Sequence, residues 1–187
     1  LLGAPCIKLP HFTARDAMAL IDRHQVTVLA AVSTQFMMIL NGAEAFRLDS
    51  LRILYTGGEA VPQPRAEAFE KRTGASVLQF YGSNESGAFS HTCLDDDSDR
   101  RFSTAGRIIP EMHVRLFDEA GRDVTASGRG RPAGRGPLLS RGYFNDPEAN
   151  ARLFTDDGWM LMEDIVEIDA EGYLRVVGRV GDFIIRG

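Results

Sequence analysis

The stretch from residue 51 to residue 85, LRILYTGGEAVPQPRAEAFEKRTGASVLQFYGSNE, decides the fold class of this chain. Its first five residues, Leu51 to Tyr55, are mostly apolar and predict a strand. Pro62 to Arg72 predicts a helix, with a proline at its start and Gly74 at its end. Ser76 to Phe80 predicts the next strand. A strand, a helix and a strand of these lengths indicate parallel pairing, with helices covering the faces of the sheet.

The sequence upstream of this stretch continues the alternation of helix and strand. Thr13 followed by Asp16 is typical of a helix start, where a side-chain oxygen accepts a backbone hydrogen bond. Val26 to Val32 is a short apolar run and predicts a buried strand. Thr34 to Leu40 predicts a helix that ends at Asn41-Gly42. The first half of the chain is therefore predicted to be α/β.

The second half of the chain has a different pattern, of short strands and turns. His113 to Phe117 alternates in polarity, and Ile165–Ile168 and Tyr173–Val177 flank a four-residue connection typical of a hairpin. These features predict an antiparallel sheet or a small barrel. The acidic run at 95–99 predicts a solvated loop, and we place the boundary between the two halves at residues 94 to 103.

The composition narrows the range of partners. The chain has 187 residues, 44% of them hydrophobic and 25% charged, which is typical of a globular protein. Its formal net charge of -5 makes nucleic acid and anionic membranes poor expected partners. Two cysteines, Cys6 and Cys93, cannot form a disulfide framework and favour a reduced, cytoplasmic setting. The longest apolar run falls short of the ~20 residues that a transmembrane helix needs.

Candidate ligand-binding residues follow the predicted strands. Tyr81-Gly82-Ser83-Asn84-Glu85-Ser86-Gly87 comes directly after one strand, at the end where open α/β sheets bind ligands. A tyrosine ring can stack on a purine, and the carboxylate of Glu85 can hold Mg²⁺. Thr56-Gly57-Gly58-Glu59 follows the preceding strand, and its glycines can form a pocket floor. The alternative for each segment is a plain turn.

Two further segments of the second half carry charged candidates. Asp164 follows Asp157-Gly158-Trp159, and its carboxylate can accept hydrogen bonds from two ribose hydroxyls. Arg179 can pair with a phosphate, although a surface ion pair is the alternative. Gly128 to Pro132 looks like an arginine hook for the minor groove of DNA. Because its surroundings are not basic, a solvated loop or a glycine-rich turn between strands is the better interpretation.

Six short motifs occur in this chain in the order typical of the adenylate-forming superfamily, which comprises acyl- and aryl-CoA synthetases, peptide-synthetase adenylation domains and luciferases. The resemblance covers essentially the whole chain. The segments that resemble the motifs of this superfamily are Val32-Ser33-Thr34-Gln35-Phe36, Gly57-Gly58-Glu59, Tyr81-Gly82-Ser83-Asn84-Glu85, Gly136-Pro137 with Arg141 to Ala149, Asp157-Gly158-Trp159 with Asp164, and Gly178-Arg179 with Asp182.

The resemblance implies an ATP-dependent acyl-CoA synthetase, with fatty acid metabolism as an expected setting. The enzyme would activate a carboxylic acid as an acyl-adenylate and transfer it to coenzyme A, using ATP and Mg²⁺. The implied fold is part of a parallel α/β subdomain with helices on both faces over residues 1–94, a small antiparallel, barrel-like β lobe over 103–180, and a hinge over 181–187. We expect the chain to be an internal fragment that is inactive alone, with a phosphate-binding loop upstream and a small C-terminal domain downstream.

The resemblance also implies a role for individual residues. Tyr81 would stack on adenine, Glu85 would bind Mg²⁺, Asp164 would hold the ribose hydroxyls, and Arg179 would contact the ribose or a phosphate. The remaining implied residues are Gly58, Glu59, Gly82, Ser83 and Asn84 around the nucleotide, Phe36, Gly58 and Gly82 at the acyl pocket, and Asp182 at the hinge.

Two alternatives to the acyl-CoA synthetase stay open. The first is an adenylation domain that loads a carrier protein, which differs only in the acceptor thiol. The second is a non-catalytic homologue that binds a nucleotide or an acyl group. Asn84 stands where the superfamily has threonine, and Met162-Glu163 stands where it has Thr-Gly before Asp164. The added carboxylate at Glu163 would bring a negative charge close to the nucleotide.

Overall fold

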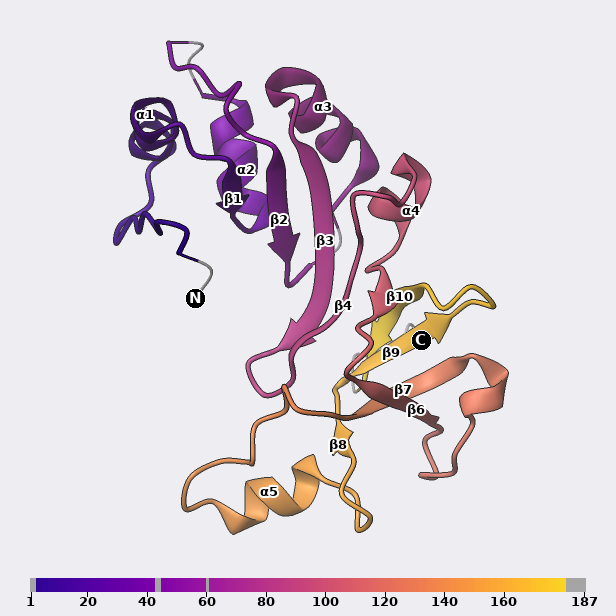
Figure 1. The fold of residues 1–187 in the computed structure, drawn as a ribbon. Helices are drawn as coiled ribbons and strands as arrows, with labels where there is room; N and C mark the ends of the chain where they lie inside the picture. Colours follow the sequence, from indigo (N-terminus) through magenta and orange to yellow (C-terminus); the bar gives the residue numbers. More distant parts are fainter. Residues whose placement is uncertain (1–2, 43–44, 60, 181–187) are drawn as a thin grey trace, which may run out of the picture. The chain divides into compact units, whose positions relative to one another are not determined.

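The computed structural model describes residues 3–42, 45–59 and 61–180. The chain divides into two compact units, Leu1–Leu78 and Gln79–Gly187 (Figure 1). In the first unit the elements alternate between helix and strand, as the sequence predicts. They are α1 (Ala14–His24), β1 (Val28–Ala30), α2 (Ser33–Leu40), β2 (Ile53–Gly57), α3 (Gln63–Thr73) and the beginning of β3 (Ser76–Ser83), which continues into the second unit.

The parallel pairing predicted for the first half is present between β1 and β2. Strand β1 runs parallel to β2, with Val28 opposite Ile53 and Ala30 opposite Tyr55. The helix start at Thr13 is confirmed, because its hydroxyl accepts a hydrogen bond of 3.0 Å from the backbone N–H of Asp16. These local signals fix where the elements begin.

The core of the first unit forms around aromatic side chains of two helices. The rings of Phe36 in α2 and Phe69 in α3 meet edge to face, with 5.6 Å between their centroids. Such pairs add specific geometry to the burial of apolar area. Helix α3 ends at Gly74, whose φ of 74° lies in the left-handed region that favours glycine.

The prediction of a buried strand at Val26 to Val32 is wrong in its length and in its burial. Strand β1 contains only three residues, and the side chain of Val28 is 53% exposed. The physical reason is the position of β1 at the edge of its sheet, where a strand has a neighbour on one side only. Hydrophobic composition predicts a strand here but does not distinguish an edge strand from a central one.

The second unit contains the antiparallel structure predicted for the second half. Strand β3 pairs with β4 (Gly87–His91), and β4 pairs with β5 (Arg107–Ile108). A separate five-stranded antiparallel sheet has the order β10-β9-β7-β6, with β8 paired to β7. Its strands are β6 (His113–Phe117), β7 (Arg129–Arg135), β8 (Met160–Leu161), β9 (Asp164–Ile168) and β10 (Leu174–Arg179).

The prediction of a solvated loop at 95–99 is wrong for its last two residues, because Ser98 and Asp99 belong to a helix. Asp97 caps α4 (Ser98–Ser103) by accepting a hydrogen bond of 2.8 Å from the backbone N–H of Arg100. Two more short helices, η1 (Thr125–Ser127) and α5 (Pro147–Leu153), connect the strands of this unit. The domain boundary at residues 94 to 103 stays a prediction.

The segment that resembles an arginine hook, Gly128 to Pro132, lies mostly in a strand. The prediction of a loop or turn there is therefore wrong for residues 129 to 132. Arg129–Arg135 is β7, which pairs with β6, β8 and β9. A Cβ atom at Gly130 would lie 2.8 Å from the carbonyl oxygen of Phe117, so the absence of a side chain permits this pairing. Glycine and proline are poor strand formers, and for that reason the sequence suggests a loop.

The core of the second unit lies between its sheets. Its fully or nearly buried members are Tyr81, Phe89, Met112, Leu116, Met162, Val166 and Leu174. Tyr81 and Met162 come from distant parts of the sequence, so this core brings the predicted site residue Tyr81 close to the segment that carries Asp164. Among the residues that the structure describes, no helix has the length and apolarity required to cross a membrane.

Candidate functional site

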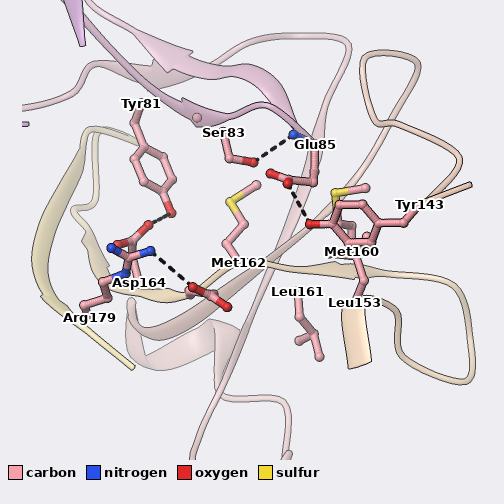
Figure 2. A pocket seen from close by; sticks show the side chains of 12 residues that line it. Tyr81, Ser83, Glu85, Tyr143, Leu153, Met160, Leu161, Met162, Asp164 and Arg179 are labelled. Carbon is pink, nitrogen blue, oxygen red and sulfur yellow. Dashed lines mark hydrogen bonds and ion pairs between the residues drawn. The ribbon is translucent and has the colours of Figure 1, made fainter. Parts of the chain in front are cut away.

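A cavity of about 240 Å³ lies within residues 79–187 (Figure 2). Its lining residues come from the end of β3, the turn after it, the segment before α5, the last residue of α5, strands β8 and β9 with the two residues between them, and the end of β10. Six of the predicted site residues line this cavity. They are Tyr81, Gly82, Ser83, Glu85, Asp164 and Arg179.

A hydrogen bond joins the aromatic and acidic members of the cavity. The hydroxyl of Tyr81 donates to Oδ2 of Asp164 at 2.7 Å. The tyrosine is 9% exposed, and its ring lies edge-on to Phe89 with 6.3 Å between centroids. Burial, together with the bond to Asp164, raises the pKa of Tyr81 well above its usual value. The phenol therefore stays neutral and keeps its proton for the carboxylate.

The turn between β3 and β4 is fixed by serine hydroxyls. The backbone N–H of Ser83 donates to Oγ of the buried Ser86 at 2.9 Å, and the backbone N–H of Glu85 donates to Oγ of Ser83 at 3.2 Å. A Cβ atom at Gly82 would lie 1.8 Å from the carbonyl oxygen of Gly87, so only glycine fits there. Ser86 belongs to the predicted segment, but its own role was not predicted; the signal for it is the pair of serines three residues apart around a turn.

The carboxylate of Glu85 has a phenol as its side-chain partner. The hydroxyl of Tyr143 donates to Oε1 of Glu85 at 2.7 Å, as Figure 2 shows. This bond, with a further one from Ser83, lowers the pKa of Glu85 below its usual value, because it favours the charged form. Tyr143 belongs to one of the six motifs, but the sequence analysis did not name it as a site residue.

Arg179, the positively charged side chain that lines the cavity, forms an ion pair with Glu163. An Nη atom of Arg179 lies 3.2 Å from Oε2 of Glu163, and the backbone N–H of Val180 donates to the carbonyl oxygen of Glu163 at 2.7 Å. Both side chains line the cavity and both are mainly exposed. The sequence singled out Glu163 as an extra charge at this place, but its pairing with Arg179 requires the register of β9 and β10.

The other predicted site residues do not line this cavity. Asn84 is exposed in the turn, although its neighbours line the cavity. Gly58 and Glu59 are exposed in the first unit, and Phe36 is fully buried there against Phe69. Their roles stay predictions. The predicted hinge residue Asp182 lies outside the described residues.

The donor set of the cavity fits a nucleotide and a nucleotide-bound cation. An aromatic ring, a carboxylate that can accept from hydroxyls and a guanidinium suit a base, a ribose and a phosphate, respectively. In the described part of the chain, no group of three or more acidic, histidine or cysteine side chains could hold a metal ion. A single carboxylate, that of Glu85, suits Mg²⁺ that arrives on a phosphate, since this ion is commonly held by one or two carboxylates together with substrate phosphates.

The fold of this chain is shared with solved enzymes. O-succinylbenzoate coenzyme A synthetase from Bacillus subtilis, in complex with ATP and magnesium ion, matches with a TM-score of 0.79 and 28% identity. The match covers 94% of this chain and 36% of that enzyme. This fold is that of the adenylate-forming enzymes. Residues 1–144 match the AMP-binding enzyme family, and the chain belongs to that family.

Curated relatives act on different acids. Over the whole chain, the sequence is 31% identical to the medium-chain fatty-acid–CoA ligase of Escherichia coli (strain K12), of which it covers 33%. It is 34% identical to the 2,3-dihydroxybenzoate–AMP ligase of Bacillus subtilis (strain 168), with 99% of the chain and 35% of the relative covered. The chain therefore spans about a third of the length of these relatives.

Proposed function

We propose that the protein is an AMP-forming acid–thiol ligase that activates a carboxylic acid with ATP and transfers the acyl group to coenzyme A. In the first step a carboxylate oxygen attacks the α-phosphorus of ATP, the bond to the bridging oxygen of the β-phosphate breaks, and pyrophosphate leaves. In the second step the thiol attacks the acyl carbon and AMP leaves. The observation that carries this proposal is the cavity that unites Tyr81, Glu85, Asp164 and Arg179.

Each of these residues has a proposed task that its surroundings support. The carboxylate of Asp164 would accept the ribose hydroxyls, and its bond to Tyr81 holds it in place. The ring of Tyr81 would face the adenine. Arg179 would leave Glu163 and contact the ribose or the α-phosphate. Glu85 would hold Mg²⁺, which would neutralise phosphate charge. Adenylyl transfer depends on such positioning and on stabilisation of the developing charge.

The proposed activity belongs to the full-length protein that contains these residues. The chain spans about a third of its relatives, so further segments would supply the rest of the phosphate site, the hinge motion and the coenzyme A site. The 187 residues alone would not complete the reaction. Cys6 and Cys93 are both free and exposed, which favours the cytoplasm as the place of action.

Two observations favour other outcomes. One relative is a 2,3-dihydroxybenzoate–AMP ligase, and this favours an adenylation enzyme that hands an aromatic acid to a carrier protein. The ion pair between Glu163 and Arg179 favours a homologue that binds a nucleotide without turning it over, because the arginine is already engaged by an acid.

The test is pyrophosphate release by the full-length protein with a panel of medium-chain fatty acids and aromatic acids, with and without coenzyme A. Acid-dependent release that coenzyme A accelerates is the expected result. Release that coenzyme A leaves unchanged favours a carrier protein as acceptor. No release with any acid, from a folded protein that binds AMP, contradicts the ligase. As a control, Asp164→Ala should weaken AMP binding; wild-type affinity would contradict the role of Asp164.

A further inference from the structure

The contact between Tyr143 and Glu85 joins two segments that are 58 residues apart in the sequence. The phenol donates to one carboxylate oxygen at 2.7 Å, a length typical of a hydroxyl that bonds to a charged acceptor. Both residues line the cavity, and in Figure 2 their side chains point toward each other. A contact at this place can influence any ligand that Glu85 binds.

The segment that carries Tyr143 is anchored on both sides of the contact. The backbone N–H of Tyr143 donates to Oδ1 of Asn150 at 2.7 Å, and Nδ2 of Asn150 donates back to the carbonyl oxygen of Tyr143 at 2.9 Å. The backbone N–H of Ser140 donates to the carbonyl oxygen of Glu85 at 2.7 Å. Gly142 has a φ of 120°, and a Cβ atom there would lie 2.5 Å from Oδ1 of Asn150. The phenol is thus held in place by its own backbone.

The choice of a phenol has an electrostatic consequence. A lysine or arginine would orient the carboxylate equally well but would neutralise its charge. Within residues 3–42, 45–59 and 61–180, no lysine or arginine forms an ion pair with Glu85. A neutral phenol fixes the orientation and leaves the full negative charge for a cation. Groups that orient a ligand of a metal ion act in this way.

We propose that Tyr143 is a positioning residue, which orients the Glu85 carboxylate for the divalent cation that accompanies the nucleotide phosphates. Tyr143 acts through Glu85 and does not itself contact the reacting atoms. This inference rests on the proposed function, because it takes Glu85 as the residue that holds the cation.

The test compares ATP binding by the full-length protein in the presence of Mg²⁺ and in the presence of EDTA, by titration calorimetry. Tyr143→Phe removes one hydroxyl from a partly exposed side chain, so the variant should fold. We expect the variant to bind ATP like the wild type in EDTA. The factor by which Mg²⁺ strengthens ATP binding should be about tenfold smaller in the variant than in the wild type, which is the lower end of the effect typical for residues that orient a metal ligand. Glu85→Gln should abolish the enhancement, and Tyr143→Phe should change nothing further in the Glu85→Gln background.

Tyr173→Phe is the matched control. The hydroxyl of Tyr173 also donates to a carboxylate, Oδ1 of Asp96 at 2.5 Å, but neither residue lines the cavity. This variant should keep the whole enhancement by Mg²⁺. The same response to Mg²⁺ in Tyr143→Phe as in the wild type would overturn the inference. An equal loss in EDTA would also overturn it, since that result indicates a general structural role.

The failure of the proposed function is distinguishable from the failure of this inference. A wild-type protein that binds ATP more tightly with Mg²⁺ but releases no pyrophosphate with any acid contradicts the ligase, and Tyr143 can still be judged by the binding data. ATP binding that Mg²⁺ does not change in the wild type overturns the inference, whatever the enzymatic activity. A wild-type protein that does not bind ATP at all contradicts both.

Discussion

The hydroxyl of Tyr81 lies 2.7 Å from Oδ2 of Asp164 and donates its proton to it, although 83 residues separate the two. The contact links β3 to β9 within residues 79–187. It gives the acid a neutral hydrogen-bond donor, which fixes the orientation of the carboxylate. Because the tyrosine is buried, the same bond also contributes to the packing of the core.

Tyr81→Phe tests this link. We expect the free energy of unfolding to fall by about 1–2 kcal/mol, because Asp164 loses a buried hydrogen-bond donor. AMP should bind more weakly as well, since the carboxylate is no longer held. Urea unfolding and calorimetry measure the two effects. In the Asp164→Ala background, Tyr81→Phe should cost much less; the full cost in that background would show that the phenol acts through another group.

The ion pair of Glu163 and Arg179 leads to the second prediction. Glu163→Gln should raise the affinity for AMP, up to about fivefold at low salt, because the arginine is released from its partner and one negative charge leaves the cavity. The gain should shrink at high salt, where charges on exposed groups are screened. Glu171→Gln is the control, since Glu171 pairs with Arg100 and does not line the cavity. Unchanged or weaker AMP binding in Glu163→Gln contradicts the prediction.

Sequence patterns that depend on neighbours along the chain predicted the fold well. The parallel pair of β1 and β2 and the hairpin of β9 and β10 follow from runs of apolar residues and from turn residues between them. The exposure of Val28 was not predictable in this way, because burial depends on which strand lies at the sheet edge. Strand β7 was not predicted, because glycine and proline residues are poor strand formers and their place in this strand depends on its pairing with β6.

For the site, too, local patterns predicted individual residues but not the contacts between distant ones. Motif spacing indicated Tyr81, Glu85, Asp164 and Arg179, and all four line one cavity. The partners of these residues were not predicted. Tyr143 reaches Glu85 because an anchored segment carries it there. Such contacts between distant residues require the register of the strands and the path of the loops, which no local pattern contains.

Gly82 is the subject of the third prediction. A Cβ atom at this position would lie 1.8 Å from the carbonyl oxygen of Gly87, a backbone atom that cannot move without breaking the turn. Gly82→Ala should lower the free energy of unfolding by about 2–3 kcal/mol and displace Glu85, so that Mg²⁺ no longer strengthens ATP binding. Urea unfolding and calorimetry measure both. Gly172→Ala, at a turn with open space and a φ of 85°, should cost about 1 kcal/mol and leave ATP binding unchanged.

The turn after β6 should make the free energy of unfolding depend on pH. Oδ1 of Asp118 accepts from the backbone N–H groups of Ala120 and Arg122, and the Arg122 guanidinium donates to Oδ2 at 2.7 Å. The backbone bond from Arg122, and then its side chain, hold the pKa of Asp118 below its usual value. The unfolded chain, with a pKa of about 3.9 for this group, therefore takes up the proton more readily than the folded chain does.

The contribution of Asp118 to stability is thus complete above about pH 5 and is lost as the pH falls through the folded pKa. In Asp118→Asn an amide oxygen can still accept from the backbone, but the ionisable group and the ion pair with Arg122 are gone. The wild type should be the more stable protein at pH 7, and the urea midpoints of the two proteins should converge as the pH falls from 4 to 2.5. Midpoints that stay a constant distance apart over that range would mean that Asp118 keeps the same pKa in the folded and unfolded chains.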